Sequence, residues 1–460
     1  MKPKFLYSFF VLFLFVFCYS CKDNNNGNVD STPPYNRNRA VDLESFTPIE
    51  GGMATRVILK GDNFGNDPKS VKVYFNHKQA PVVGCAHGRA LVITPRQPGD
   101  ECDISVVIGN DSVVYPEKFV YHTRTIVTTV VWQEGTTAFR VGSFAETTFS
   151  YPAYLTVDYQ GNLFLSNWSG GTADVHFSLI DQERRMVTIL ATARDNPASF
   201  MVPTTDYEGK VVLAPAAGGD DANYDNYYEF DSEAQWAART RKVLHPTIDD
   251  QKEGKVDFVL DAFKHSLAIC MMDSMIYYRS NRDGKLIRFN PRTRKGEWAT
   301  NERGEPIYFR QGHNADGYLA FGPVNKHILY GVLGGNNSHC VGWCNILTGE
   351  SGILAGQQGT PGWRDGKLED ALFNRPRQMV VDNDGNLMIA DNYNHCIRKI
   401  DLQTGIVTTV VGIAGKAGYK DGNPDDAEFR NPYGVTIDRR DGSIYVADYG
   451  NKVIRKLTIE

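Results

Sequence analysis

The sequence lacks an excess of basic residues. Its 49 lysines and arginines stand against 54 aspartates and glutamates, so the formal net charge is −5. Proteins that bind nucleic acid usually present a basic face that neutralises phosphates. The charge balance therefore excludes nucleic acid as an expected partner.

The sequence also lacks the short motifs of several enzyme classes. It contains no G-x-S-x-G nucleophile elbow, no H-E-x-x-H zinc motif and no glycine-rich nucleotide loop. The paired carboxylates of a glycoside hydrolase cannot be distinguished among 54 acidic residues. We therefore expect a non-catalytic protein with no cofactor and no metal.

The long apolar run at the start of the chain, Phe5–Phe17, is too short to cross a bilayer as a helix. It follows Lys2 and Lys4 and ends in CYSC, which is the order of a secretory signal. The segment resembles a bacterial lipoprotein signal. This resemblance implies that residues 1–20 are removed and that the thiol of Cys21 carries a lipid. An ordinary secretion signal cut nearby is the alternative.

Residues 21–40 are polar and rich in turn formers, with nothing to bury. They predict a flexible tether. Lys22 and Asp23 resemble the start of the surface-export signal of Bacteroidota lipoproteins. The resemblance implies a lipid-anchored protein of the outer membrane, exposed on the cell surface rather than facing the periplasm.

Residues 41–123 contain many short apolar runs separated by turns, which predict an all-β sandwich. The elements FTPIEGG, VILKGDNFG, VKVYFN, ITP and FVYH resemble the IPT/TIG family of immunoglobulin-like domains, which implies a spacer without a catalytic site. Cys85 and Cys102 lie in this segment, and an exported protein could join them in a disulfide.

A unit of 56 residues is repeated near the C-terminus. GWRDG at 362–366 aligns without gaps with GYKDG at 418–422 (418 − 362 = 56), and NSHC at 337–340 aligns with YNHC at 393–396. Each unit contains four short apolar runs, as in the blade of a β-propeller. The unit NPYGVTIDRRDGSIYVADYGNKVIRKL resembles an NHL repeat. The resemblance implies a six-bladed NHL-type propeller over residues 124–460.

Weaker copies of the unit begin at Tyr151 and near Phe200, Leu267 and Leu319. These copies and the two clear units give six blades, although the middle copies match poorly enough that five or seven remain open.

The sequence IVTTVV occurs twice, at Ile126–Val131 and at Ile406–Val411. The second copy is the outer strand of its unit, whereas the last unit ends one strand short. We therefore expect the first copy to pair with the last unit and to close the ring, which removes exposed sheet edges.

The loops that enter each blade and the loops between second and third strands open on one face of a propeller. Aromatic rings beside Asn, Asp and Arg on that face suit a sugar. The candidate ligand-binding residues are Trp168, Trp363, Arg364, Arg377, Tyr393, Tyr419, Tyr433 and Tyr449, together with Trp236 at the end of an acidic, aromatic insertion at 218–236. Trp363 and Tyr419 belong to the repeat pattern and could instead pack between blades.

Two histidines, His339 and His395, occupy equivalent positions in adjacent units. A metal site or a general base is conceivable there. Since Asn-His at this point is part of the NHL pattern, we expect both to be structural.

The order of lipid anchor, tether, spacer and propeller resembles surface glycan-binding lipoproteins of Bacteroidota polysaccharide-utilisation systems. The resemblance implies capture of a polysaccharide or oligosaccharide for uptake, with an outer-membrane transporter as a candidate partner. A propeller lyase or hydrolase, and an adhesion or protein-interaction module, are the alternatives.

Overall fold

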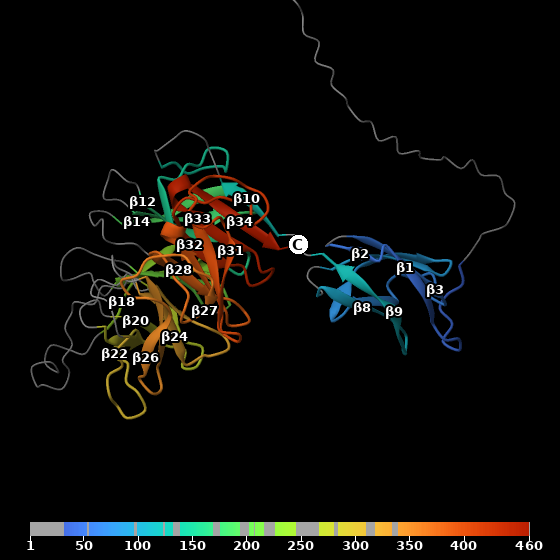
Figure 1. Cartoon of the computed structure of the whole chain (residues 1–460), viewed down its shortest axis with the longest axis horizontal. Coiled ribbons are helices and arrows are strands. Elements are labelled where there is room, and N and C mark those ends of the chain that lie inside the picture. The colour runs from blue at the N-terminus through green and yellow to red at the C-terminus, as the bar shows by residue number, and fades with distance from the viewer. Residues whose placement is uncertain are drawn as a thin grey trace, which may run out of the picture. The chain divides into compact units, whose positions relative to one another are not determined.

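The computed structural model describes residues 32–52, 55–95, 99–122, 125–131, 139–168, 175–193, 202–206, 208–215, 226–244, 266–279, 284–309, 318–333 and 339–459. The chain divides into two compact units, one that ends at His122 and one that begins at Thr123 (Figure 1). The expected signal, the lipidated Cys21 and the first part of the insertion, 218–225, lie outside the described residues. No helix among the described residues is both long and apolar enough to span a membrane.

The first unit consists of two sheets around one core. In β8 the buried residues Cys102, Ile104, Val106 and Ile108 alternate with less buried ones, which is the period of two expected for a half-buried strand. Buried side chains from both sheets form a single hydrophobic cluster. One sheet has the order β1 (Asp42–Thr47), β3 (Arg56–Asp62), β7 (Arg89–Ile93), β6 (Val82–Ala86), and the other β2 (Glu50–Gly51), β9 (Asp111–Tyr121), β8 (Glu101–Ile108), β4 (Val71–Phe75), β5 (Lys78–Ala80).

The expected disulfide between Cys85 and Cys102 is wrong, because both are free thiols. Cys85 lies on β6 of one sheet and Cys102 on β8 of the other. The Sγ of Cys102 donates instead to the carbonyl oxygen of Gly99 at 3.1 Å, and burial raises the pKa of this thiol to about 11. A shared domain is not sufficient for a disulfide, which requires matched positions of both Cβ atoms.

The described strands of the second unit form six sheets, which is consistent with six propeller blades. We number the sheets one to six along the chain and call the strand that begins each sheet its first strand. The first sheet has the order β11 (Tyr151–Val157), β12 (Leu163–Trp168), β13 (Val175–Asp181), β14 (Met186–Ala193), and the second has the order β15 (Thr204–Thr205), β16 (Val211–Pro215), β17 (Asn226–Asp231), β18 (Ala238–Lys242). The third has the order β19 (Ala268–Ile269), β20 (Ile276–Arg279), β21 (Leu286–Phe289), β22 (Gly296–Trp298), and the fourth has the order β23 (Tyr318–Phe321), β24 (Ile328–Leu333), β25 (Cys340–Asn345), β26 (Ser351–Gly356). The fifth has the order β28 (Pro376–Val381), β29 (Leu387–Asp391), β30 (Cys396–Asp401), β31 (Ile406–Val411), with the short β27 (Gly366–Lys367) beside β31, and the sixth has the order β32 (Pro432–Ile437), β33 (Ile444–Asp448), β34 (Val453–Ile459), β10 (Thr125–Val131).

The sixth sheet is completed by a strand from the beginning of the unit. β10 pairs antiparallel with β34, with Val127 opposite Leu457 and Thr129 opposite Arg455. Val127 and Val131 are each only 1% exposed. The prediction that the first IVTTVV copy pairs with the last unit is therefore confirmed, and Figure 1 shows β10 beside β34.

The first strands of neighbouring sheets contact one another in the order β11, β15, β19, β23, β28 and β32, and β32 in turn contacts β11. We call the space between these six strands the channel. Each first strand leads into a tight turn to the second strand of its sheet.

In several sheets an aspartate organises this turn. In the fifth sheet Asp382 Oδ1 accepts hydrogen bonds from the backbone N–H groups of Asp384 and Asn386 at 2.9 and 2.8 Å. Gly385 provides the left-handed backbone with φ of +90°. Asp158 makes the same pair of bonds in the first sheet. The Asp-x-x-Gly-Asn pattern of the repeat thus has a local structural cause.

Candidate functional site

Four partly exposed aromatic side chains, Trp168, Tyr151, Tyr449 and Tyr433, form a continuous row across the first and sixth sheets. We call them the aromatic row. Successive ring centroids are 5.8, 5.1 and 4.9 Å apart, and the last pair is stacked. The rings lie where first strands begin and second strands end, which is the end of the sheets predicted to carry the ligand.

Cationic side chains lie over these rings. The guanidinium of Arg377 is 4.6 Å from the centroid of Tyr433, and the ammonium of Lys452 is 5.6 Å from that of Tyr151. Beside the row, Arg375 lies 4.7 Å from the ring of Tyr393 and donates to its hydroxyl at 3.1 Å. These groups add hydrogen-bond donors next to apolar ring faces.

Burial, and then the neighbouring phenols of Tyr433 and Tyr151, raise the pKa of Tyr449 to about 12. The phenol of Tyr449 therefore stays neutral at ordinary pH and keeps its O–H as a donor. Tyr393 also acts on this pKa, which places it in the electrostatic neighbourhood of the row.

The channel is filled beneath the aromatic row. The ring of Tyr154 lies 5.3 Å from that of Tyr433, and its hydroxyl hydrogen-bonds to the hydroxyl of Tyr318, which belongs to the fourth sheet. Gln378 Nε2 donates to Leu155 O at 2.7 Å, and Leu155 N donates back to Gln378 Oε1 at 3.0 Å. A Cβ on Gly434 would lie 2.9 Å from Gln378 Oε1, so glycine at this position leaves room for the Gln378 side chain to reach Leu155.

Other predicted ligand residues lie away from the row. Trp363 donates from Nε1 to Thr409 Oγ1 on β31 at 3.0 Å, and the Tyr419 hydroxyl is 2.9 Å from Thr129 Oγ1 on β10. Both rings therefore lie over fourth strands, at the outside of their sheets. Arg364 is exposed, and its backbone pairs with Leu372.

Trp236 is part of the core. It is 8% exposed, and its ring meets that of Phe164 edge-on at 4.8 Å. The structure thus brings together Trp168, Arg377, Tyr433 and Tyr449, with Tyr393 nearby, and separates Trp236, Trp363, Arg364 and Tyr419 from them.

The sequence analysis missed Tyr151, Arg375 and Lys452. The available signal was position, because Tyr151 directly precedes the proline of its blade repeat and Arg375 precedes the equivalent Pro376.

The repeated W-R-D-G and Y-K-D-G segments each provide an aspartate that binds a buried arginine. Asp365 Oδ1 accepts from Arg398 Nη2 at 2.7 Å, and Arg398 Nη1 donates to Asp391 Oδ2 at 2.9 Å. In the sixth sheet Arg455 joins Asp421 and Asp448 in the same way, at 2.7 and 3.1 Å. We call these two groups the arginine–aspartate clusters.

Burial raises the pKa of Asp391 to about 6 and that of Asp448 to about 7, even though an arginine opposes the rise in each cluster. Sequence reasoning missed both arginines, although IRK recurs in the third strand of both units.

His339 and His395 act as hydrogen-bond acceptors for the backbone. His339 Nδ1 accepts from Arg375 N, and His395 Nδ1 accepts from Asn431 N, both at 3.1 Å. Burial lowers the pKa of each imidazole, which keeps it neutral. Over the described ranges no group of three or more His, Cys, Asp or Glu could hold a metal.

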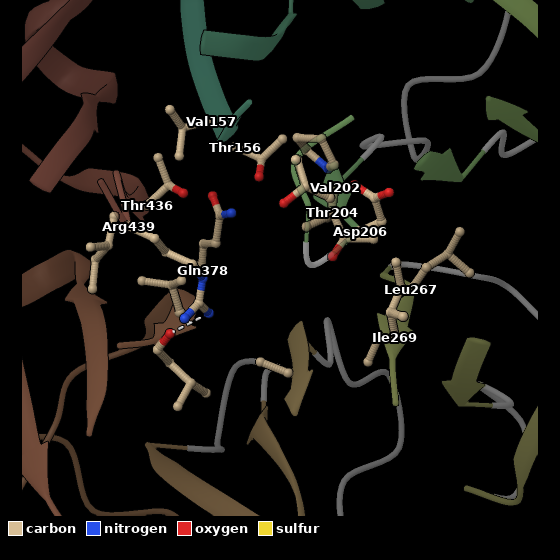
Figure 2. Close-up of a pocket in the computed structure, with 18 of the residues that line it drawn as sticks. Thr156, Val157, Val202, Thr204, Asp206, Leu267, Ile269, Gln378, Thr436 and Arg439 are labelled. Atoms are coloured by element: carbon tan, nitrogen blue, oxygen red, sulfur yellow. Dashed lines mark hydrogen bonds between the residues drawn. The ribbon is translucent and has the colours of Figure 1, made fainter. Parts of the chain in front are cut away.

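A cavity of about 280 Å³ lies at the opposite end of the channel, where the first strands finish (Figure 2). All six first strands contribute to its wall. Figure 2 shows Thr156, Thr436 and Gln378 on one side of the open centre, with Thr204 and Asp206 across from them. This cavity was not predicted from the sequence, because its wall combines residues from all six sheets, only two of which belong to clear repeats.

Comparisons with known proteins bear on both units. Residues 43–121 match the IPT/TIG domain, and residues 373–400 match the NHL repeat. The chain is 34% identical over 150 residues to Protein SUPPRESSOR OF QUENCHING 1, chloroplastic, of Arabidopsis thaliana. The aligned part is 31% of this chain but only 14% of that protein, so the chain spans a small part of that relative.

Several solved structures from Bacteroides have a similar fold. A protein of unknown function from Bacteroides thetaiotaomicron has a TM-score of 0.71 at 24% identity, over 93% of this chain and 100% of that one. An auxiliary nutrient binding protein from Bacteroides ovatus has a TM-score of 0.62 at 22% identity, with the same coverage.

Two further structures come from Bacteroides thetaiotaomicron. An auxiliary nutrient binding protein has a TM-score of 0.57 at 23% identity, and a putative phosphatase has 0.57 at 19%, each over 93% of this chain and 99% of that one. The chain therefore combines an IPT/TIG domain with an NHL repeat, and its fold is similar to that of auxiliary nutrient binding proteins of Bacteroides.

Proposed function

We propose that this chain is a lipid-anchored outer-membrane protein, exposed on the cell surface, that binds a polysaccharide or oligosaccharide for uptake without cleaving it. The ligand lies on the aromatic row, and an outer-membrane transporter receives it. The second unit in this proposal is a closed six-bladed propeller. The fold similarity to nutrient binding proteins of Bacteroides agrees with the proposal.

The aromatic row is the observation that carries the proposal. Trp168, Tyr151, Tyr449 and Tyr433 follow one another as partly exposed aromatic rings with apolar faces, and Tyr433 is stacked on Tyr449 and lies under Arg377. A sugar ring stacks its C–H groups on such faces, while its hydroxyls accept from cations and donate to carbonyls. A row of several rings suits successive sugars of one chain better than a single small molecule.

Two features support a closed ring. The first strands contact one another in a cyclic order, and β10 gives the sixth sheet its fourth strand. A ring would bring the first and sixth sheets together, and the row crosses between these two sheets.

Retardation of the protein in gels that contain a polysaccharide tests ligand binding. We expect wild-type protein to be retarded by at least one polysaccharide of a broad set. Tyr433→Ala and Trp168→Ala should each weaken binding by about tenfold or more, as for aromatic residues central to an interface. Tyr419→Ala is the matched control, because this tyrosine is also exposed but lies over β10.

Two results would count against the proposed site. Migration unaffected by every polysaccharide would remove the proposed ligand class. Equal losses from Tyr433→Ala and Tyr419→Ala would show that the effect does not come from the aromatic row.

Size analysis of the polysaccharide after incubation separates capture from cleavage. We expect its chain length to be unchanged by the protein. Shortened products, above all unsaturated ones, would establish the lyase or hydrolase alternative instead.

The anchor is tested in cells with Cys21→Ala. We expect wild-type protein to fractionate with membranes and to be cut by protease added to intact cells. The variant should leave the membrane fraction, since its thioether-linked lipid is missing. Membrane association that survives this change would contradict lipidation at Cys21.

A further inference from the structure

The cavity at the far end of the channel has the wall of a small binding site. Its volume of about 280 Å³ is near the lower end of the range for ligand pockets, roughly 300–1,000 Å³. Of the four threonines that line it, Thr156, Thr204 and Thr436 belong to three different first strands. Val202, Leu267 and Ile269 add an apolar side (Figure 2).

The arginines of the wall are already engaged. Arg439 donates from Nη1 to Asn383 Oδ1 at 2.7 Å and from Nη2 to Val381 O at 2.8 Å. Arg440 donates from Nε to Asp438 Oδ1 at 2.9 Å and also binds the second oxygen of that carboxylate through Nη2. Each guanidinium is therefore already paired with protein oxygens, and the carboxylate of Asp438 offsets the charge of Arg440.

The carboxylate of Asp206 differs from the other turn aspartates of the wall. Its Oδ1 accepts from Lys210 N at 2.7 Å and from Val211 N at 3.1 Å, which is the usual turn arrangement. In contrast, the second oxygen of Asp158 accepts from Asn162 Nδ2 at 2.9 Å. The backbone of Gly209 also acts on this carboxylate, but no side chain among the described residues donates to Oδ2, so this oxygen can accept from a ligand.

The cavity is separated from the aromatic row. Tyr318 lines the cavity, and its hydroxyl bonds to Tyr154, which lies under the row. Gln378 crosses from the fifth sheet to Leu155 in the first sheet and also lines the cavity. A polymer on the row therefore does not reach the cavity through these contacts.

We propose that this cavity is a second site, which binds one neutral polyhydroxylated molecule the size of a monosaccharide. Hydroxyl groups of the ligand donate to Asp206 Oδ2 and exchange hydrogen bonds with the three threonines, while its C–H groups lie against Val202, Leu267 and Ile269. The volume suits a single small ring, and an acid is disfavoured because the wall has four acidic residues, Asp158, Asp206, Glu208 and Asp438, against two arginines. The site does not depend on polysaccharide binding by the aromatic row.

Thermal unfolding and calorimetry of the full chain with single sugars test this site. The probes are unmodified hexoses and pentoses at millimolar concentration, with a uronic acid and an amino sugar as charged counterparts. We expect at least one neutral sugar to raise Tm and to bind with one-to-one stoichiometry. Asp206→Asn should weaken its binding about tenfold, because Asn keeps the Oδ1 acceptor but changes the second oxygen into a donor.

The matched control is Asp382→Asn. Asp382 organises the equivalent turn of the fifth sheet but does not line the cavity, so this change should leave sugar binding unaltered. Ala320→Met fills the cavity from β23 and should abolish binding. Retained circular dichroism and retained retardation by polysaccharide would show that both variants fold.

Three outcomes would overturn the proposal: no neutral sugar binds, only a charged sugar binds, or Asp206→Asn and Asp382→Asn have the same effect. Loss of sugar binding in Tyr433→Ala with full binding in Ala320→Met would also overturn it, because the sugar would then lie on the aromatic row. If no polysaccharide retards the protein but a neutral sugar still binds, the proposal for the aromatic row is wrong and the proposal for the cavity is unaffected.

Discussion

The fifth and sixth sheets of the second unit are stabilised differently from the second and third. The fifth and sixth each contain a buried arginine, Arg398 or Arg455, that is fully inaccessible to solvent and joins two aspartates. The described residues of the second and third sheets share a hydrophobic cluster of aliphatic and aromatic side chains, in which Tyr227 packs against Phe289 with centroids 5.2 Å apart. Their first strands have only two residues each.

This difference shows what the repeat motif does. An arginine–aspartate cluster fixes the loop before a blade to the ends of its second and third strands through directional hydrogen bonds. Trp363 and Tyr419 belong to those loops, so they lie over the outer strands instead of joining the aromatic row. Within the aromatic row, Trp168 and Tyr151 belong to the first sheet, which departs from the motif, whereas Tyr433 and Tyr449 belong to the sixth sheet, which follows it.

The first sheet illustrates such a departure. Asn167 pairs with Pro152, as Asp391 pairs with Pro376 and Asp448 with Pro432. Asn167 Oδ1 accepts from Tyr151 N at 3.2 Å, so a neutral amide binds the backbone one position away from where Asp391 and Asp448 accept in their sheets. The residue after it is Trp168, a member of the aromatic row.

Breaking an arginine–aspartate cluster should have the largest effect on stability. Arg398→Met leaves Asp391 buried without its cation, and we expect the free energy of unfolding to fall by about 3–5 kcal/mol. Denaturant unfolding followed by circular dichroism measures this change. Arg288→Met is the control from the third sheet, because Arg288 pairs with Asp273 and Glu297 but keeps 29% of its side chain exposed.

The control should cost about 1 kcal/mol or less, as for partly exposed pairs. Adding Asp391→Asn to Arg398→Met should recover part of the loss, because the fifth sheet would then have the neutral arrangement of the first. Equal costs for Arg398→Met and Arg288→Met would refute the contrast between the two kinds of sheet.

The two IVTTVV strands, β10 and β31, have the same local sequence, so the same substitution can compare how much each strand contributes to stability. Val127 on β10 and Val407 on β31 are 1% and 0% exposed. Val127→Ala and Val407→Ala should each lower the free energy of unfolding by about 1–3 kcal/mol, from lost burial and the remaining cavity. The same denaturant experiment applies. A negligible cost for Val127→Ala beside a full cost for Val407→Ala would mean that β10 is not held in the sixth sheet.

Much of the fold could be predicted because the residues that define the repeat act on their near neighbours in the sequence. Turn residues such as Asp382 and Gly385 act within a few positions, and the surplus strand at Ile126–Val131 was recognisable by its identity to another strand. The six sheets and the pairing of β10 follow from such signals. The weak middle copies were harder to align, since first strands of two residues leave almost no periodic pattern.

The site could be predicted only in part, because contacts between sheets depend on side-chain direction in three dimensions. Position in the repeat was enough to predict that Tyr433 and Tyr449 lie at the same end of the sheets, but it could not tell that Trp363 turns toward Thr409. Likewise, nothing local shows that Trp236 packs on Phe164, or that Thr156 and Asp206 line one cavity.

The smallest effect on the free energy of unfolding is expected from removing a buried hydroxyl group in the second sheet. The hydroxyl of Tyr227 is buried, and no described group hydrogen-bonds to it; burial also raises its pKa to about 12. Tyr227→Phe keeps the ring against Phe289 and removes an unsatisfied group, whose desolvation costs about 1–3 kcal/mol in general. We therefore expect unfolding free energy to stay constant or to rise by about 1 kcal/mol. A clear loss of stability would show that this hydroxyl has a partner in solution, and that the second sheet also depends on a buried polar contact.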